Sequence, residues 1–171
     1  MFSGCLFAAT GSAAESVRLI TAAITAVRLK GGSTLWVPLY LSSLAIAYAE
    51  LGQVDDAWHS IDEALRTLEA TGEKWCEAEV NRVAGEIALA SPDRDVAKSE
   101  AYFERAVAVA RQQQAKSWEL RAAMSLARLW QDQGKSQQAR ELLDPVYGWF
   151  AEGFDTPDLK DARALLEGLK A

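Results

Sequence analysis

The chain has 171 residues, of which 50% are hydrophobic and 25% are charged. This length and composition suit one globular domain with a sizeable core and are not those of a disordered or fibrous chain. The net charge is −6, and residues 31–90 carry ten acidic against three basic side chains. No basic face is predicted that would neutralise phosphates, so we expect no nucleic-acid partner.

Other classes of site are excluded on composition. Cys5, Cys76 and the single His59 do not have the spacing of a metal site, and we predict neither metal nor cofactor. No apolar stretch is long enough to span a membrane. The N-terminus lacks the basic segment of an export signal, so we expect a cytoplasmic protein with reduced thiols.

Residues 1–32 predict a truncated first repeat. Gly11 and Ile20 recur 41 residues later as Gly52 and Ile61. Residues 2–10 then correspond to the second half of a helix whose first half is missing. The apolar side chains of Phe2, Leu6 and Phe7 would need cover, either from a longer chain or from another surface such as a second copy.

Residues 33–72, 73–115 and 116–152 predict three further helix-turn-helix repeats. Each contains a Trp, then a small residue nine positions later that follows an apolar residue, then a bulky residue three positions further on. These positions are Trp36, Leu44, Ala45 and Tyr48; Trp75, Val83, Ala84 and Ile87; and Trp118, Leu126, Ala127 and Trp130. A single Trp could anchor a ligand, but a Trp at fixed register favours packing. We therefore predict that Trp75 joins its repeat to the preceding one.

The second half of each unit supports this register. Gly52 and Gly134 lie seven residues after the small Ala, where the first helix is predicted to stop. Ala57 and Ala139 follow five residues later. The middle unit replaces the Gly turn with "SPDRD" at residues 91–95, where Pro92 breaks the helix.

Residues 153–171 predict a capping helix. Thr156 suits the N-cap and Pro157 the first helical position. One face is apolar and the other charged, as expected of a helix that ends a solenoid.

The pattern of small and bulky positions resembles the tetratricopeptide (TPR) repeat. Small residues allow two helices to approach, and each helix pair must stack on its neighbours to cover its apolar faces. The resemblance implies a single all-α domain over residues 1–171. We expect a right-handed solenoid of TPR-like helix pairs with a C-terminal capping helix.

A narrower resemblance covers residues 31–170. "AKSWELRAAMSLARLWQDQGK" and the tail "PVYGWFAEGFDTPDLK" are similar to the extreme C-terminus of large bacterial signalling proteins. In that family a class III adenylate/guanylate cyclase domain and a P-loop ATPase module precede a TPR-like array. The resemblance implies a regulatory or assembly role without enzymatic activity, because this chain contains neither catalytic domain.

Three apparent functional motifs are better explained as ordinary parts of the helical repeats. "GKS" at residues 134–136 lacks the earlier Gly of a phosphate-binding loop. The carboxylates of Glu77, Glu79 and Glu86 are predicted to form a solvated acidic face rather than an acid–base pair. His59 has no evident partner for a pH-sensitive role.

In TPR arrays the first helix of each pair lines the concave face. That assignment also places Ile46, Gly85 and Ala88 on the face, and the predicted partner-binding residues are Ser42, Glu50, Asn81, Arg121, Met124, Arg128 and Asp132. Arg and Asn side chains suit a peptide backbone or a carboxylate. We hypothesise a non-enzymatic module that binds a protein or peptide partner. The alternatives are a homodimer through the apolar N-terminus and a small-molecule sensor in a cyclase/ATPase signalling system.

Overall fold

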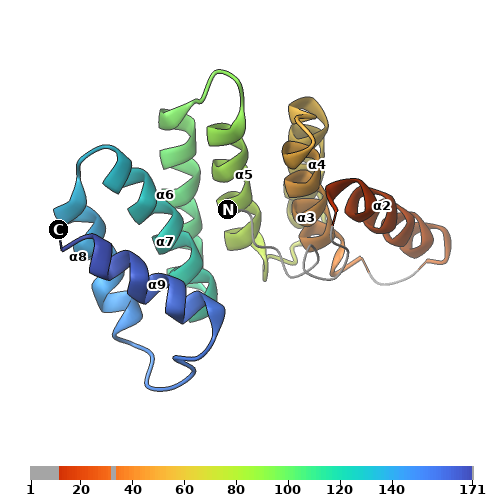
Figure 1. Ribbon diagram of the computed structural model, residues 1–171. Helices are drawn as coiled ribbons and strands as arrows, with labels where there is room; N and C mark the ends of the chain where they lie inside the picture. The colour runs from red at the N-terminus through yellow and green to blue at the C-terminus, as the bar shows by residue number, and fades with distance from the viewer. Residues whose placement is uncertain (1–11, 32–33, 171) are drawn as a thin grey trace.

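The computed structural model describes residues 12–31 and 34–170, and the fold expected for residues 1–11 lies outside that part of the chain. Over the described residues the chain forms eight α-helices and no strand, which confirms the all-α prediction. They follow one another in a row from α2 to α9 (Figure 1). Their bounds are α2 (Ala13–Leu29), α3 (Val37–Glu50), α4 (Val54–Thr71), α5 (Glu77–Ala90), α6 (Val96–Gln112), α7 (Lys116–Asp132), α8 (Ser136–Tyr147) and α9 (Pro157–Gly168).

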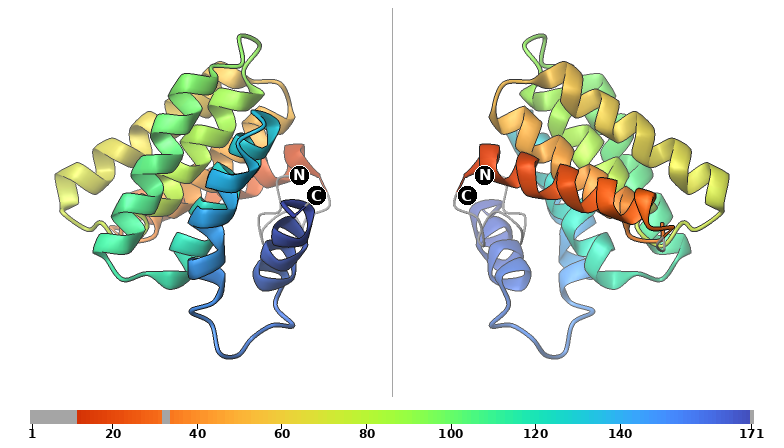
Figure 2. Two further views of the ribbon diagram at one scale, coloured as in Figure 1. Left: turned by 90° about the vertical axis from the view of Figure 1, so that its left-hand side faces the viewer. Right: turned by 90° about the vertical axis from the view of Figure 1, so that its right-hand side faces the viewer.

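The helices form two layers. Helices α3, α5, α7 and α9 contact one another in series, and we call them the inner layer. Helices α2, α4, α6 and α8, the outer layer, pack against the flanking inner helices; their backbones do not approach one another, although side chains meet between α2 and α4 and between α4 and α6. Because neighbouring helices pack closely in the inner layer and lie farther apart in the outer layer, the array is curved. The inner helices lie on the inside of the curve. Figure 2 shows the row from its two ends.

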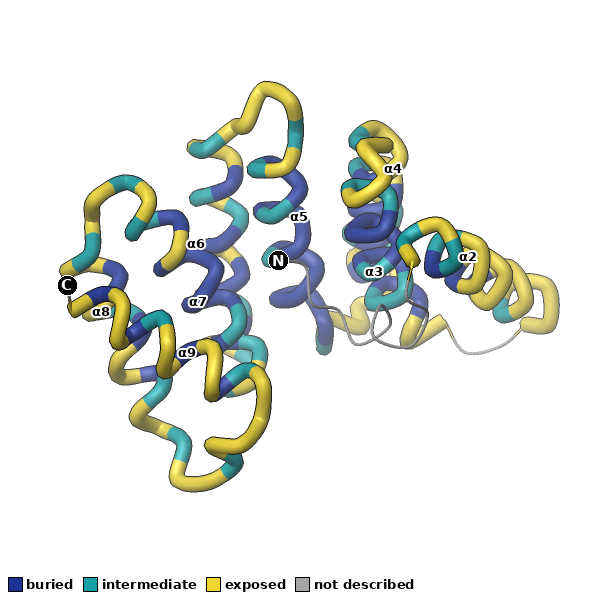
Figure 3. Tube along the Cα trace, viewed as in Figure 1, coloured by how far each residue is buried: buried dark blue, intermediate teal, exposed yellow. Residues whose placement is uncertain are grey.

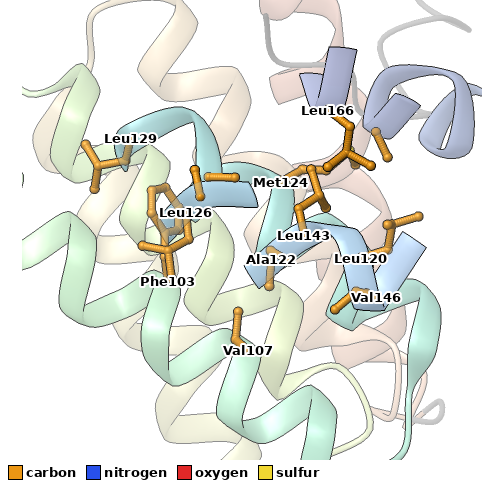
Figure 4. Packing of buried hydrophobic residues seen from close by; sticks show 14 of the residues in the cluster. Phe103, Val107, Leu120, Ala122, Met124, Leu126, Leu129, Leu143, Val146 and Leu166 are labelled. Carbon is orange, nitrogen blue, oxygen red and sulfur yellow. The ribbon is translucent and has the colours of Figure 1, made fainter. Parts of the chain in front are cut away.

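Two clusters of buried apolar side chains fill the space between the layers. The first runs from α2 to α5 and includes Ile20, Leu41, Ile61 and Ile87. The second runs from α6 to α9 and includes Phe103, Leu120, Leu126, Leu143 and Leu166 (Figure 4). The inner helices α5 and α7 are buried along most of their length, whereas α2 and α9 expose one side (Figure 3). Burial of these faces is the main favourable contribution to the stacking of repeats.

The predicted Gly turns are confirmed. Gly52 and Gly134 have φ values of 74° and 76° and follow the last residues of α3 and α7. The amide of the next residue bonds back to the helix in both turns: Gln53 N donates to Tyr48 O at 2.9 Å, and Lys135 N to Trp130 O at 2.8 Å. This is a Schellman motif, which favours Gly because the position is left-handed.

The tail ends in α9, which packs on α7 and α8. Thr156 occupies the N-cap position and Pro157 begins the helix, as predicted. The Thr156 side chain does not cap the helix, because its hydroxyl donates to Gly153 O at 2.7 Å instead. Leu159, Ala162 and Leu166 are buried against the preceding repeat.

Trp36 and Trp75 connect two successive repeats. The rings of Trp36 and Trp75 meet edge to face with centroids 4.7 Å apart. Trp75 Nε1 also donates to Leu35 O at 3.1 Å. The prediction that Trp75 joins its repeat to the preceding one is therefore confirmed. One repeat further on, Gln113 Nε2 makes the corresponding bond to Lys74 O at 2.7 Å.

Candidate functional site

Three of the predicted groove residues are buried, namely Ser42, Met124 and Asn81. Ser42 is 1% exposed, and its hydroxyl donates to Leu39 O within α3. Met124 is 4% exposed and belongs to the apolar cluster shown in Figure 4. The assignment of Ser42 and Met124 to an open face is thus corrected, because both side chains fill space between helices.

The side of α5 that was assigned to the concave face is also corrected, although α5 itself belongs to the inner layer. Gly85 faces α6, where a Cβ on Gly85 would lie 2.5 Å from Phe103 Cε1. Asn81, one turn earlier on the same side, lines a hollow shared by α4, α5 and α6. These positions therefore face the outer layer, and the opposite side of α5 carries Glu79, Arg82 and Glu86.

Three predicted residues are exposed. Glu50 ends α3, while Arg128 and Asp132 lie on the last turns of α7. Asp132 makes a long ion pair with Arg94, at 3.7 Å. None of the three lines either of the hollows described below.

The remaining predicted residue, Arg121, belongs to an ion-pair network between inner helices. Its Nη1 lies 3.4 Å from Glu79 Oε1 on α5, and its Nε lies 3.1 Å from Asp158 Oδ2 on α9. Arg121 therefore links three successive inner helices, and part of its hydrogen-bonding capacity is already used.

Arg82 is the centre of this network. It pairs with Glu79 at 2.8 Å and with Glu86 at 3.2 Å, and Ser125 of α7 donates to Glu86 at 2.7 Å. The carboxylates predicted to be a solvated face are thus paired and largely buried. Burial alone would raise the pKa of Glu79, but Arg82, followed by Arg121, outweighs burial and lowers the pKa below its usual 4.5.

A hollow with polar lining residues lies on the outer side of α5. It has a volume of about 380 Å³ and lies between α4 and α6, with α5 beneath. The backbones of the outer helices α4 and α6 do not pack closely, which leaves room for it. Its lining residues are Leu65, Leu68, Glu69, Lys74, Glu77, Asn81, Tyr102 and Arg105.

The base of the hollow is polar and buried. Asn81 is 1% exposed, and its Nδ2 donates to Glu77 O at 2.8 Å. Its Oδ1 accepts no hydrogen bond from the described residues. The fully buried side-chain oxygens without a partner among the described residues are those of Ser99 and Gln113, so the Asn81 oxygen is not one of them and is available to accept a ligand N–H.

The edge of the hollow carries two cations. Arg105 Nη2 lies 2.9 Å from Glu77 Oε1, and Lys74 Nζ lies 3.8 Å from Glu77 Oε2. The side chains of Arg105 and Lys74 remain 62% and 57% exposed. Glu77 is therefore neutralised from the hollow side, while both cations keep N–H groups toward solvent.

An aromatic contact closes one side of the hollow. Tyr102 of α6 lies 6.0 Å from Trp58 of α4, centroid to centroid, and Lys98 Nζ lies 3.8 Å from the Trp58 ring centroid. Burial, followed by the nearby Asp62 carboxylate, raises the pKa of Tyr102. The Tyr102 hydroxyl is therefore neutral near pH 7 and can donate or accept a hydrogen bond.

Sequence reasoning identified only Asn81 among these residues. Arg105 and Glu77 are 28 residues apart and meet across two helices. The one available signal was the spacing of Tyr102 and Arg105, which places them on one side of a helix. Nothing in the sequence indicated that this side would remain uncovered.

A second, more open hollow of about 590 Å³ lies near the end of α6. Arg111, Gln114, Lys116, Glu119 and Trp149 line it. Both cations bond to the buried Glu119 carboxylate, at 2.9 and 2.7 Å. This arrangement resembles that of the first hollow, where Arg105 and Lys74 both pair with Glu77.

The described residues hold no group of three or more potential metal ligands, and none of their helices is long and apolar enough to cross a membrane. Burial raises the pKa of the Cys76 thiol to about 12, so this thiol is not a thiolate near neutral pH.

No family model matches the chain, and neither does any curated protein. The structure is similar to the crystal structure of a Podosopora anserina protein described as a kinesin light chain with nearly identical TPR-like repeats. The TM-score is 0.65 at 20% identity, over 95% of this chain and 80% of that one. The fold is TPR-like. A variant of the same protein gives a TM-score of 0.62 at 20% identity, over 96% and 88% of the two chains.

The similarity to these TPR-like structures concerns the fold alone. It does not bear on the resemblance to cyclase and ATPase signalling proteins, which stays a prediction. The limits of the individual repeats likewise stay as predicted from the sequence.

Proposed function

We propose that this TPR-like chain is a non-enzymatic interaction module that binds an extended peptide segment of a partner protein. The observation that supports this function is the hollow between α4 and α6, where the Asn81 side-chain oxygen accepts no hydrogen bond from the described residues and two exposed cations lie at the edge. An extended peptide offers backbone N–H and C=O groups at regular spacing, and these match such a surface.

Selection from a random peptide library tests this function. The full chain would be immobilised, and the selected peptides would be synthesised and titrated by calorimetry. We expect saturable binding of one peptide per chain with a Kd of about 1–100 μM, as is usual for a small interface. Selection of no saturable binder in repeated screens would contradict the proposal, and thermally unfolded chain serves as the control.

The inner layer remains a second surface for the same function. Glu50, Arg128 and Asp132 are its exposed members from the predicted set. An Arg128→Glu variant separates the two surfaces, because Arg128 does not line the hollow. Peptides that lose affinity with Arg128→Glu bind the inner layer. Peptides whose affinity is unchanged bind at another surface.

Self-association is the second candidate function, and α2 provides the observation that favours it. Leu19 and Leu29 on this helix are 40% and 82% exposed, and among the described helices α2 packs closely against α3, with one further ion pair between Arg28 and Glu63 of α4. An exposed apolar side on an end helix suits another helix. Sedimentation velocity of the wild type and of a Leu19→Asp/Leu29→Asp variant tests it. A concentration-dependent dimer that the variant abolishes is expected, and a strict monomer would remove this candidate.

We also propose, from the sequence resemblance, that the module serves a cyclase or ATPase signalling system. The neighbouring reading frames test this proposal without any purified protein. An adjacent cyclase or ATPase frame would support the assignment, and unrelated neighbours in several genomes would count against it.

A further inference from the structure

We propose that the hollow between α4 and α6 binds an acidic peptide segment, with a backbone N–H on Asn81 and a carboxylate on Arg105 and Lys74. The inference rests on the proposed function and specifies where the partner binds and which chemistry it presents. It places the partner on the outer layer rather than in the concave groove predicted from the sequence.

The first step concerns the Asn81 acceptor. Asn81 Nδ2 is held by Glu77 O, which fixes the orientation of the amide. Asn81 lines the hollow, and its Oδ1 accepts no bond from the described residues. A ligand donor at this point would complete its hydrogen bonding, and a peptide N–H is the donor that every residue but proline supplies.

The second step concerns the cations. Arg105 uses one Nη2–H for Glu77 Oε1 at 2.9 Å, and a guanidinium has five N–H donors in all. The buried Glu77 carboxylate thus orients Arg105 while its outward edge remains open to a ligand. Lys74 lies on the other oxygen of the same carboxylate, at 3.8 Å. A ligand carboxylate would complete this arrangement with charge-assisted hydrogen bonds.

The third step gives the segment a direction. Glu69 lines the hollow from α4, whereas Arg105 lines it from α6. A ligand carboxylate is repelled by the first wall and attracted by the second. Leu65 and Leu68, also on α4, offer apolar surface to a neighbouring side chain of the ligand. The acidic group therefore lies toward α6 and the apolar group toward α4.

Fluorescein-labelled heptapeptide pools, measured by anisotropy on the full chain, test the inference. One pool carries a central Asp and an amidated C-terminus, and a second has no acidic side chain but a free C-terminal carboxylate. A third pool has neither. We expect the third pool to bind about tenfold more weakly than the better of the first two, as for a lost charge-assisted bond. The stronger of the first two identifies the source of the carboxylate.

Variants assign the effect to the hollow. Arg105→Gln is expected to weaken the acidic pool about tenfold. Glu69→Gln is expected to strengthen it two- to threefold, roughly, by removing a repulsive charge. Arg140→Gln, an exposed arginine of α8 outside the hollow, is the matched control and should change nothing.

The donor to Asn81 is tested from the ligand side, so that folding is not at issue. N-methylation of the backbone next to the Asp is expected to weaken binding about fivefold, as for one neutral hydrogen bond. With Asn81→Leu, which thermal unfolding must show to be folded, N-methylation should have no further effect. If Asn81→Leu does not fold, the N-methyl peptide on the wild type decides alone.

Two outcomes would overturn the inference. One is equal binding of all three pools, and the other is an acidic pool whose affinity is unchanged in Arg105→Gln. In either case peptides selected from the random library could still bind elsewhere, and the proposed function would stand. If no peptide of any kind binds, the proposed function itself fails.

Discussion

At Gly85, helix α5 lies so close to α6 that no Cβ can be accommodated. A Cβ there would lie 2.5 and 2.6 Å from two ring carbons of Phe103, which is fully buried. Gly85 is helical rather than left-handed, so only the close approach of the two helices explains it. A buried aromatic ring cannot move away from an added methyl group without displacing its neighbours.

Gly85→Ala is therefore expected to lower the free energy of unfolding by about 2 kcal/mol, despite the better helix propensity of Ala. Urea denaturation followed by circular dichroism measures it. Gly168→Ala in α9 is the control, because its Cβ would meet only Gln131 Nε2, at 3.7 Å. That change should be neutral or stabilising.

A double variant identifies the cause. Phe103→Leu in the Gly85→Ala background should cost less than Phe103→Leu alone, because the smaller side chain makes room for the methyl group. Additive costs would show that Phe103 is not the obstacle.

Trp75 allows a prediction about the junction between repeats. Trp75→Phe keeps a ring beside Trp36 but removes the N–H donor to Leu35 O. The expected loss is about 1 kcal/mol of unfolding free energy, as for one hydrogen bond. Trp149→Phe, at a 60% exposed site, should have little effect. A loss of binding without any loss of stability in Trp75→Phe would instead favour the rejected role of Trp75 as a partner anchor.

At the scale of helices and turns, one Schellman motif lacks its usual residue. Helix α6 ends with Gln114 N donating to Arg111 O at 3.1 Å and Ala115 N donating to Ala110 O at 2.9 Å. This is the bonding seen after α3 and α7, but the left-handed position holds Gln114 at φ 54° instead of Gly. A side chain in this conformation costs about 1 kcal/mol.

Gln114→Gly is accordingly expected to raise the free energy of unfolding by about 0.5–1 kcal/mol. The reciprocal change, Gly134→Gln, should lower it by a similar amount, since Gly134 has φ 76° in the same motif. Thermal unfolding of both variants at matched concentration checks the pair. Destabilisation by Gln114→Gly would mean that the Gln114 side chain contributes more than its backbone costs.

Turn positions were predictable from the sequence, and helix faces were not. Gly52 and Gly134 identify their turns because a left-handed residue is a local requirement. Which side of α5 faces the inside of the curve depends on the helices that pack against it. A rotation of half a turn in the predicted register exchanges its inner and outer sides. Asn81 was predicted to face the inside of the curve on repeat register alone, and Arg105 could not be paired with Glu77 without the packing of α5 on α6.

At the scale of the whole molecule, buried carboxylates connect the repeats. Glu79 lies in the inner-layer network, and Glu119 bonds to Lys116 and to Arg111. Burial opposes the charge of Glu119, but Lys116 and then Arg111 outweigh it and lower its pKa. The pKa of Glu100 is lowered first by the indole N–H of Trp130. All three carboxylates are thus more acidic in the folded chain than in the unfolded chain.

Groups with a lowered pKa stabilise the fold in full above their unfolded pKa near 4.5 and lose this contribution as the pH falls toward the folded pKa. The free energy of unfolding is therefore expected to decline below about pH 4.5. Glu79→Gln should reduce the difference in unfolding free energy between pH 7 and pH 3.5, as well as the stability at pH 7. Glu104→Gln, on the exposed side of α6, is the control and should leave that difference unchanged.

The inner helices pack with their backbones close together, whereas α4 and α6 meet through side chains such as Trp58 and Tyr102, so bending of the array is expected at the inner contacts. Rotation at the α3–α5 and α5–α7 contacts would change the spacing of α4 and α6 more than that of the inner helices, because the outer helices lie farther from the pivot. A segment seated between α4 and α6 would hold them apart and tighten the curve. A ligand that straightened the inner side would instead narrow the outer gap. Ligand binding at one surface would then change the affinity of the other surface by changing the curvature of the array. The two surfaces would share no residue, and no helix would change internally.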